Sequence, residues 1–205
     1  MSVRQTRHSE SVFLNVPYDR KYEPLFLAFI AGVCGFGLVP RATVEIPGSQ
    51  RRLNRIIELI GQCAYSFHDL SRVTLDRTPP PTPRFNMPFE LGLAVAKAAS
   101  RRNSHQWLLF ESKPHRLGKS LSDVDGTDPY IHDGTPEGVL RALTNALVSR
   151  RKSPNLSELE GMYAVFRRAA AKRKKELRGA SLFEARAFTD LVLLALDIGA
   201  RGQSS

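Results

Sequence analysis

The fold is decided by the stretch from residue 11 to residue 35, which reads SVFLNVPYDRKYEPLFLAFIAGVCG. Its first six residues are mostly β-branched, aromatic or aliphatic, and the run stops at Pro17, which is typical of a strand. Apolar residues then dominate from Tyr22 to Gly35, and Pro24 falls in the first turn, where a helix does not need its missing N–H. The stretch therefore predicts a strand followed by a helix.

The same alternation of short apolar runs and amphipathic segments continues to residue 150. Repeated strand–helix units form a parallel sheet covered by helices on both faces. We therefore expect an α/β domain with a flavodoxin-like five-stranded parallel sheet, in which the apolar first strand is central. The other strands are expected at residues 38–40, 64–70, 106–110 and 130–131, and further helices open at residue 47 and span 88–100 and 136–150.

The C-terminal part of the chain departs from this pattern. We divide the chain into an α/β domain at residues 1–151 and a C-terminal helical extension at residues 152–205. The last helix, expected from Leu182 to Ile198, is apolar on nearly all sides and must be buried. It packs either on the domain or in a homodimer, and the burial of Leu182, Phe188, Leu191 and Leu194 is expected in both cases. The homodimer is the preferred arrangement.

Positive charge is concentrated in one segment. The chain has a net charge of +10, and residues 150–178 hold ten basic and three acidic residues. A basic segment suggests a polyanionic partner, so residues 167–178 are a candidate site for nucleic acid or a protein partner. The alternative is a solvated helix face.

Several features bear on the compartment. The longest apolar run, residues 25–37, is shorter than the roughly 20 residues that span a bilayer, and no signal peptide is recognisable. Cys34 and Cys63 lie in apolar helical patterns, which indicates buried thiols in a reducing compartment. We expect a cytoplasmic protein with no membrane segment.

Standard cofactor and metal motifs are missing. Gly118-Lys119-Ser120 looks like the end of a P-loop, but Lys113 stands where that motif needs its first glycine. No Gly-x-Gly-x-x-Gly follows the first strand, and the five histidines lack metal-ligand spacing. We expect no metal and no cofactor, with any nucleotide acting as a substrate.

Polar residues gather where the expected strands end, which is the edge at which α/β folds bind ligands. Glu90 is the sharpest candidate, because it lies between apolar neighbours just behind Pro88. An acidic residue in a first helical turn is also explained by the helix dipole alone. The other candidates are Tyr18, Asp19, Asp69, Ser71, Asn86 and Met87.

Three motifs in order resemble the nucleoside 2-deoxyribosyltransferase-like branch of the TIR-like superfamily. They are NVPYD at residues 15–19, FHDLS at 67–71 and FELGLA at 89–94, within a resemblance that covers about residues 11–150. The resemblance implies that Glu90 is the catalytic carboxylate, facing the anomeric carbon. It also implies that Asp69 binds ribose hydroxyls, and that Tyr18 and Asn86 hold the sugar or base in the same cleft.

One departure from that family bears on the reaction. The transferases carry Asp-x-Gly just before the glutamate, and that aspartate helps to protonate the leaving base, whereas Arg84-Phe85-Asn86 stands here. Nicotinamide leaves NAD as a neutral molecule and needs no such acid, so the departure favours an N-glycosidase acting on a nucleotide such as NAD. A role as a toxic effector in prokaryotic defence would fit that activity. The alternatives are a non-catalytic nucleotide-sensing or assembly module and a nucleoside 2-deoxyribosyltransferase.

Overall fold

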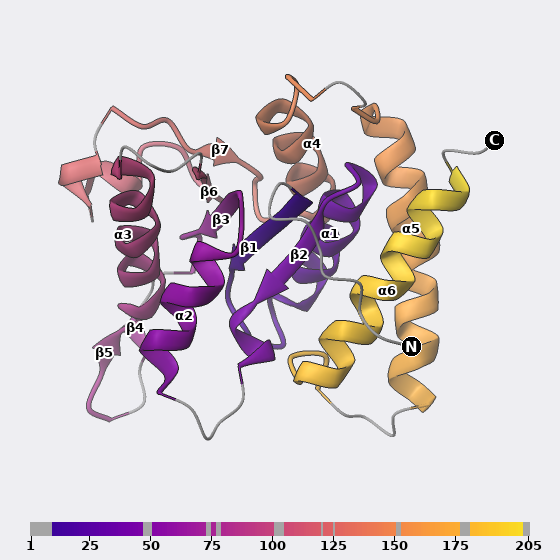
Figure 1. The fold of residues 1–205 in the computed structure, drawn as a ribbon, viewed down its shortest axis with the longest axis horizontal. Coiled ribbons are helices and arrows are strands. Elements are labelled where there is room, and N and C mark those ends of the chain that lie inside the picture. The colour runs from indigo at the N-terminus through magenta and orange to yellow at the C-terminus, as the bar shows by residue number, and fades with distance from the viewer. Residues whose placement is uncertain are drawn as a thin grey trace.

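The computed structural model describes residues 10–46, 51–72, 75–76, 79–100, 105–119, 121–124, 126–150, 153–176 and 181–202. A five-stranded sheet forms the centre of the molecule, with helices on both sides of it (Figure 1). Its strands are β1 (Ser11–Asn15), β2 (Val39–Ala42), β3 (Tyr65–Asp69), β6 (Gln106–Glu111) and β7 (Tyr130–Ile131).

All neighbouring strands of this sheet are parallel, and their order is β2-β1-β3-β6-β7. The flavodoxin-like α/β prediction is therefore confirmed. The first strand is not the central one, because β3 holds the middle position and β1 lies between β2 and β3. The apolar run in β1 reflects burial on both faces, which every interior strand experiences and which does not single out the middle one.

Residues along β1 alternate between two hydrophobic layers. Val12 and Leu14 pack in the cluster that includes α1 (Glu23–Gly35) and α4 (Pro136–Ala146). Phe13 packs in the cluster with α2 (Arg52–Gly61), and α3 (Asn86–Ala99) contributes Ala94 to it. The sheet is thus covered by α1 and α4 on one face and by α2 and α3 on the other.

The proline-rich connection after β3 contains two further short strands. β4 (Leu75–Asp76) and β5 (Thr82–Pro83) form a two-stranded antiparallel sheet, with Leu75 opposite Pro83. Three short 3-10 turns lie between the larger elements, namely η2 (Thr43–Glu45), η3 (Leu117–Lys119) and η4 (Ser122–Val124).

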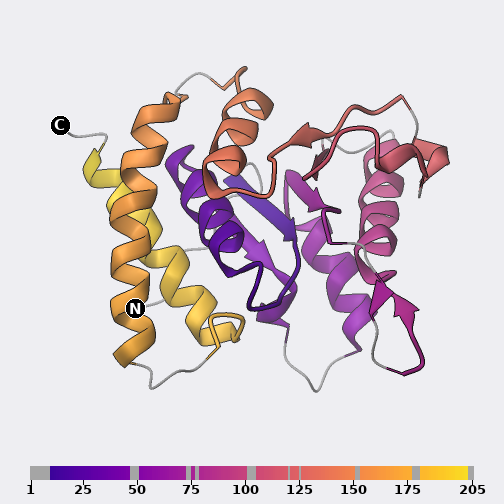
Figure 2. The same cartoon turned by 180° about the vertical axis from the view of Figure 1, so that it is seen from behind.

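The C-terminal extension consists of α5 (Leu156–Glu176) and α6 (Ala185–Gly202), and the boundary expected at residues 151–152 lies outside the described residues. α6 begins three residues later than the sequence predicts. A turn precedes it, in which the Ser181 Oγ accepts a hydrogen bond from the N–H of Phe183 at 3.2 Å and the Ser181 N–H donates to the Glu184 carboxylate at 3.3 Å. Both helices run side by side along the outer side of α1 (Figures 1 and 2).

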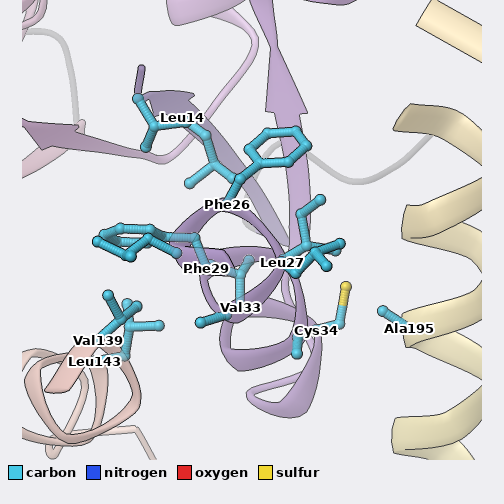
Figure 3. Close-up of a cluster of buried hydrophobic side chains, with 14 of the residues drawn as sticks. Leu14, Phe26, Leu27, Phe29, Val33, Cys34, Val139, Leu143 and Ala195 are labelled. Carbon is cyan, nitrogen blue, oxygen red and sulfur yellow. The ribbon is translucent and has the colours of Figure 1, made fainter. Parts of the chain in front are cut away.

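The apolar face of the extension is packed on the domain. Leu182, Phe188 and Leu191 are buried and share one cluster with α1 and the sheet, and Leu194 packs against it. Figure 3 shows Ala195 of α6 opposite the thiol of Cys34, while Val139 and Leu143 of α4 approach α1 from another side. Burial on the domain is therefore confirmed, and this face needs no second subunit to cover it.

Replacing Leu191 by alanine should strongly destabilise the fold. Its side chain is buried between the extension and α1, and removing such a side chain costs about 2–5 kcal/mol. Leu193→Ala on the same helix is the control, because Leu193 is exposed and its loss should cost less than about 0.5 kcal/mol. Urea unfolding of both variants measures the difference, and equal midpoints would mean that the extension does not contribute to the core.

Candidate functional site

The candidate site lies at the carboxyl edge of the sheet, where β1 and β3 stand side by side. The chain leaves β1 into α1 on one face and leaves β3 toward α3 on the other. Two neighbouring connections that diverge in this way open the sheet edge to ligands. The last residues of the two strands, Asn15 and Asp69, flank this point.

Asn15 ties β1 to the start of α3. Its side-chain nitrogen donates to the carbonyl of Met87 at 2.8 Å and contacts Nδ1 of His68 at 2.9 Å. Because that nitrogen of His68 accepts, the ring proton lies on Nε2, which is buried without a hydrogen-bond partner. Burial lowers the pKa of His68 to about 3, so the ring is neutral near pH 7.

Glu90 is not in the first turn of its helix. α3 begins at Asn86, two residues before the predicted start at Pro88, which makes Glu90 its fifth residue. Pro88 is tolerated as the third residue because the first N–H groups of a helix have no partner within it. Glu90 is 7% exposed, so it is a buried carboxylate and does not act as a surface charge on the helix dipole.

The environment of Glu90 brings the pKa of its carboxyl group close to neutral pH. None of the residues that the structure describes donates a hydrogen bond to its carboxylate. Burial raises the pKa of Glu90 to about 7, and the positive charge of Arg52 at the start of α2 opposes this shift. A carboxylate in this state can stabilise a cation or accept a proton near neutral pH.

Tyr18 and Arg52 lie within electrostatic reach of Glu90. The Tyr18 hydroxyl accepts a hydrogen bond from Thr43 at 3.1 Å and donates to the carbonyl of Leu14 at 3.4 Å. Burial raises the pKa of Tyr18, and the Glu90 charge raises it further. Sequence reasoning missed Arg52, whose position depends on where α2 begins and on how that helix meets α3.

Asp69 lies on the other side of the sheet. One carboxylate oxygen accepts the Ser71 N–H at 2.7 Å, and the other accepts the hydroxyl of Tyr22. His132 Nε2 lies 3.2 Å from the same oxygen, although its N–H is poorly aligned for a hydrogen bond. Nδ1 of His132 accepts the Gly134 N–H at 3.1 Å, which places the ring proton on the nitrogen facing Asp69.

The structure therefore does not bring Asp69 and Glu90 into one cleft. Successive residues of β3 face opposite sides, so His68 points to the α2 and α3 layer and Asp69 to the α1 and α4 layer. Asp69 is fully buried and both its oxygens are engaged. It bonds to Tyr22 and to the backbone of Ser71 and faces His132, and its complete burial keeps its oxygens away from a ribose hydroxyl. Tyr22 and His132 were missed because neither has a signal beyond an aromatic residue next to a loop.

Three of the four remaining predicted residues hold the loops around the site. Asp19 accepts backbone N–H groups of Lys21 and Tyr22, and its other oxygen lies 3.4 Å from Arg72. Ser71 contributes its backbone N–H to Asp69, and Met87 contributes its carbonyl to Asn15. Asn86 is exposed at the first position of α3.

The described residues contain no group of three or more histidine, cysteine, aspartate and glutamate side chains that could hold a metal ion. They also contain no helix that is both long enough and apolar enough to cross a bilayer.

Glu90→Gln should stabilise the fold at alkaline pH. Between the ordinary pKa of 4.5 and the folded value of about 7, the folded chain keeps a proton that the unfolded chain releases, so stability falls as pH rises. The charged carboxylate then costs the folded state up to about 3 kcal/mol above neutral pH. We expect the variant to raise Tm at about pH 8 and to leave it unchanged at about pH 4.

Glu58→Gln is the matched control for this measurement, because Glu58 is an exposed acid of α2 paired with Arg55. Its Tm should follow the wild-type curve at both pH values, since exposed ion pairs contribute little. A Glu90 variant that also follows the wild-type curve would show that the Glu90 pKa is not raised.

The comparisons with known proteins leave the family open. Neither the protein-family models, nor the curated proteins, nor the solved structures contain a match to this chain. The resemblance of residues 11–150 to the nucleoside 2-deoxyribosyltransferase-like branch therefore rests on its three motifs and stays a prediction.

Proposed function

We propose that the chain is an N-glycosidase that cleaves the bond between the sugar and the base of a nucleotide such as NAD. The observation that carries this proposal is Glu90, a buried carboxylate at the ligand-binding edge of a parallel sheet, to which no described residue donates a hydrogen bond. A carboxylate in that state is expensive to maintain unless a cationic group takes its place beside it. The sugar cation formed during glycosidic cleavage is such a group.

The chemistry requires one bond to break and one to form. In NAD the bond from C1′ to the pyridinium nitrogen breaks, and both bonding electrons go to that nitrogen, so nicotinamide leaves as a neutral molecule. The Glu90 carboxylate stabilises the positive charge left on the sugar, or bonds to C1′ until water replaces it. Water supplies the hydroxyl on C1′, and its remaining proton passes to Glu90 or to solvent.

The neighbouring residues have separate roles in this proposal. In this proposal Arg52, whose charge acts on Glu90, binds a phosphate of the nucleotide, and Tyr18 holds the sugar or base. Asp69 is a positioning residue, because its bonds to Tyr22 and Ser71 fix the ends of the loops after β1 and β3. Depletion of NAD by such an enzyme would suit a toxic effector in prokaryotic defence.

The test is incubation of the purified chain with NAD and with a panel of nucleosides, followed by chromatography for the free base. We expect nicotinamide from NAD, and we expect Glu90→Gln to abolish its release because the sugar cation loses its stabilising charge. Since the carboxylate must be ionised, kcat/KM should rise with pH through about 7. Release of base by Glu90→Gln at the wild-type rate would refute the assignment.

Two other functions give different results in the same assay. A nucleoside 2-deoxyribosyltransferase would transfer the sugar to an added acceptor base, and it would act on deoxynucleosides in preference to NAD. A non-catalytic nucleotide sensor is favoured by one observation, namely that Glu90 is only 7% exposed. That function predicts heat on titration with nucleotide in a calorimeter and no free base after long incubation.

Part of the basic segment at residues 167–178 is used within the molecule. Lys174 pairs with Glu23 of α1 at 2.7 Å, and Arg173 pairs with Asp190 of α6 at 3.0 Å. Arg168 and Lys172 are exposed, whereas residues 177 and 178 lie outside the described part of the chain. A polyanionic partner on this segment and a homodimer stay proposals, and light scattering with and without nucleic acid tests both.

A further inference from the structure

Four large apolar side chains are exposed on the face opposite the C-terminal extension. Leu53 and Ile57 on α2 are 45% and 49% exposed, and Phe85 and Phe89 at the start of α3 are 63% and 54% exposed. We refer to these four residues as the α2/α3 patch. Exposed phenylalanines are unusual on a protein surface, and a group of them marks an interaction site.

The four residues lie on neighbouring surfaces of two adjacent helices. α2 and α3 run side by side over one face of the sheet (Figures 1 and 2). At the C-terminal end of α2, Gly61 faces the side-chain amine of Lys97 on α3. One turn earlier on α3, Leu93 packs against the hydrophobic cluster to which α2 contributes. Phe89 lies one turn before Leu93 on the same side of α3, and Phe85 one turn before that. Leu53 and Ile57 lie two turns and one turn before Gly61.

The side chains bordering the patch are positively charged. Arg51 and Arg52 are exposed at the start of α2, and Lys97 is half-buried further along α3. The nearest exposed acid on α2 is Glu58, which pairs with Arg55. A partner of this surface therefore needs flat apolar groups and negative charge together.

The basic segment on α5 carries positive charge but no exposed aromatic side chain. The aromatic residues of that helix, Tyr163 and Phe166, are buried in the core. Arg173 and Lys174 are already paired within the molecule. Among the described residues, the α2/α3 patch is thus the surface where exposed aromatic rings and arginines occur side by side.

We propose that the α2/α3 patch binds single-stranded nucleic acid. Exposed bases would stack on Phe85 and Phe89, whose Cβ atoms lie roughly 5–6 Å apart on successive turns, and Arg51 and Arg52 would contact phosphates. This proposal does not depend on the glycosidase activity, because neither ring belongs to the catalytic site and binding requires no turnover. The two proposals share only Arg52.

A single strand fits the surface better than a second copy of the chain. In a two-fold dimer through this patch, the positively charged borders formed by Arg51, Arg52 and Lys97 would meet one another around an apolar interface. A duplex hides the faces of its bases, so the exposed rings would have nothing to stack on. An unpaired strand offers both base faces and phosphates.

The test is fluorescence anisotropy of a short labelled oligothymidylate titrated with the full chain. We expect saturable binding at low salt that weakens as salt is added. The double variant F85A/F89A should bind about tenfold more weakly or worse, because base–aromatic stacking is lost. Leu193→Ala, which removes an exposed apolar side chain from α6 on the other face, should bind like the wild type.

Two further variants locate the phosphate contacts and guard against misfolding. R51Q/R52Q should weaken binding and flatten its salt dependence, whereas R168Q/K172Q on α5 should leave both unchanged. Phe89→Trp keeps an aromatic ring, and the oligonucleotide should quench the fluorescence that this variant adds to that of the native Trp107.

Four outcomes would overturn the proposal. They are the absence of binding at low salt, wild-type affinity of F85A/F89A, added fluorescence in the Phe89→Trp variant that the oligonucleotide leaves unquenched, and a larger loss in R168Q/K172Q than in R51Q/R52Q.

Discussion

The arrangement of the whole chain depends on the burial of α1. From Leu25 to Gly35 every residue of this helix is buried, so it has no side that can face water. The sheet covers one side, α4 another, and α5 and α6 the rest. Glycines allow the close approach, since a Cβ on Gly32 would lie 2.4 Å from Leu143 of α4 and one on Gly35 would lie 2.5 Å from Leu159 of α5. The extension therefore completes the core.

The polar edge of the sheet is built on this core. Tyr22, at the start of α1, donates to Asp69 at the end of β3, and Asp69 faces His132 in the loop after β7. Gly138 keeps that loop close to α4, because a Cβ there would lie only 1.9 Å from the carbonyl of His132. On the opposite face Asn15 joins β1 to α3. Two separate networks thus hold the loops on the two faces of the sheet. Glu90, which receives no hydrogen bond from a described residue, lies on α3 close to the second of them.

The parallel flavodoxin-like sheet could be predicted from sequence because each strand–helix unit is local and the crossover rule restricts how such units combine. The middle position of β3 could not, because β1 and β3 are both interior strands and both largely buried. The site could be predicted only in part. The motifs identified Glu90 as a candidate, but its burial follows from the packing of α3 on the sheet, where it shares the buried face with Met87, Leu91 and Ala94. The alternation of Phe67, His68 and Asp69 already places Asp69 on the face of the buried Phe67, away from α3, although this could be seen only once the face covered by α3 was known. Arg52, Tyr22 and His132 meet the site through tertiary packing, which leaves no pattern in the sequence.

The extension reaches the candidate site as well as the core. The ring of Phe183, just before α6, lies 5.9 Å from the ring of Tyr18 and 5.1 Å from that of Phe26, measured between centroids. Tyr18 in turn bonds to Thr43 and Leu14 at the ends of β2 and β1. A displacement of α6 would remove the support of Tyr18 and uncover α1 at the same time, since one set of apolar contacts serves both. The docked C-terminal helices therefore help to hold the loop after β1, together with the bonds of Asp19 and Tyr22, so a segment far from Tyr18 in the sequence contributes to its position.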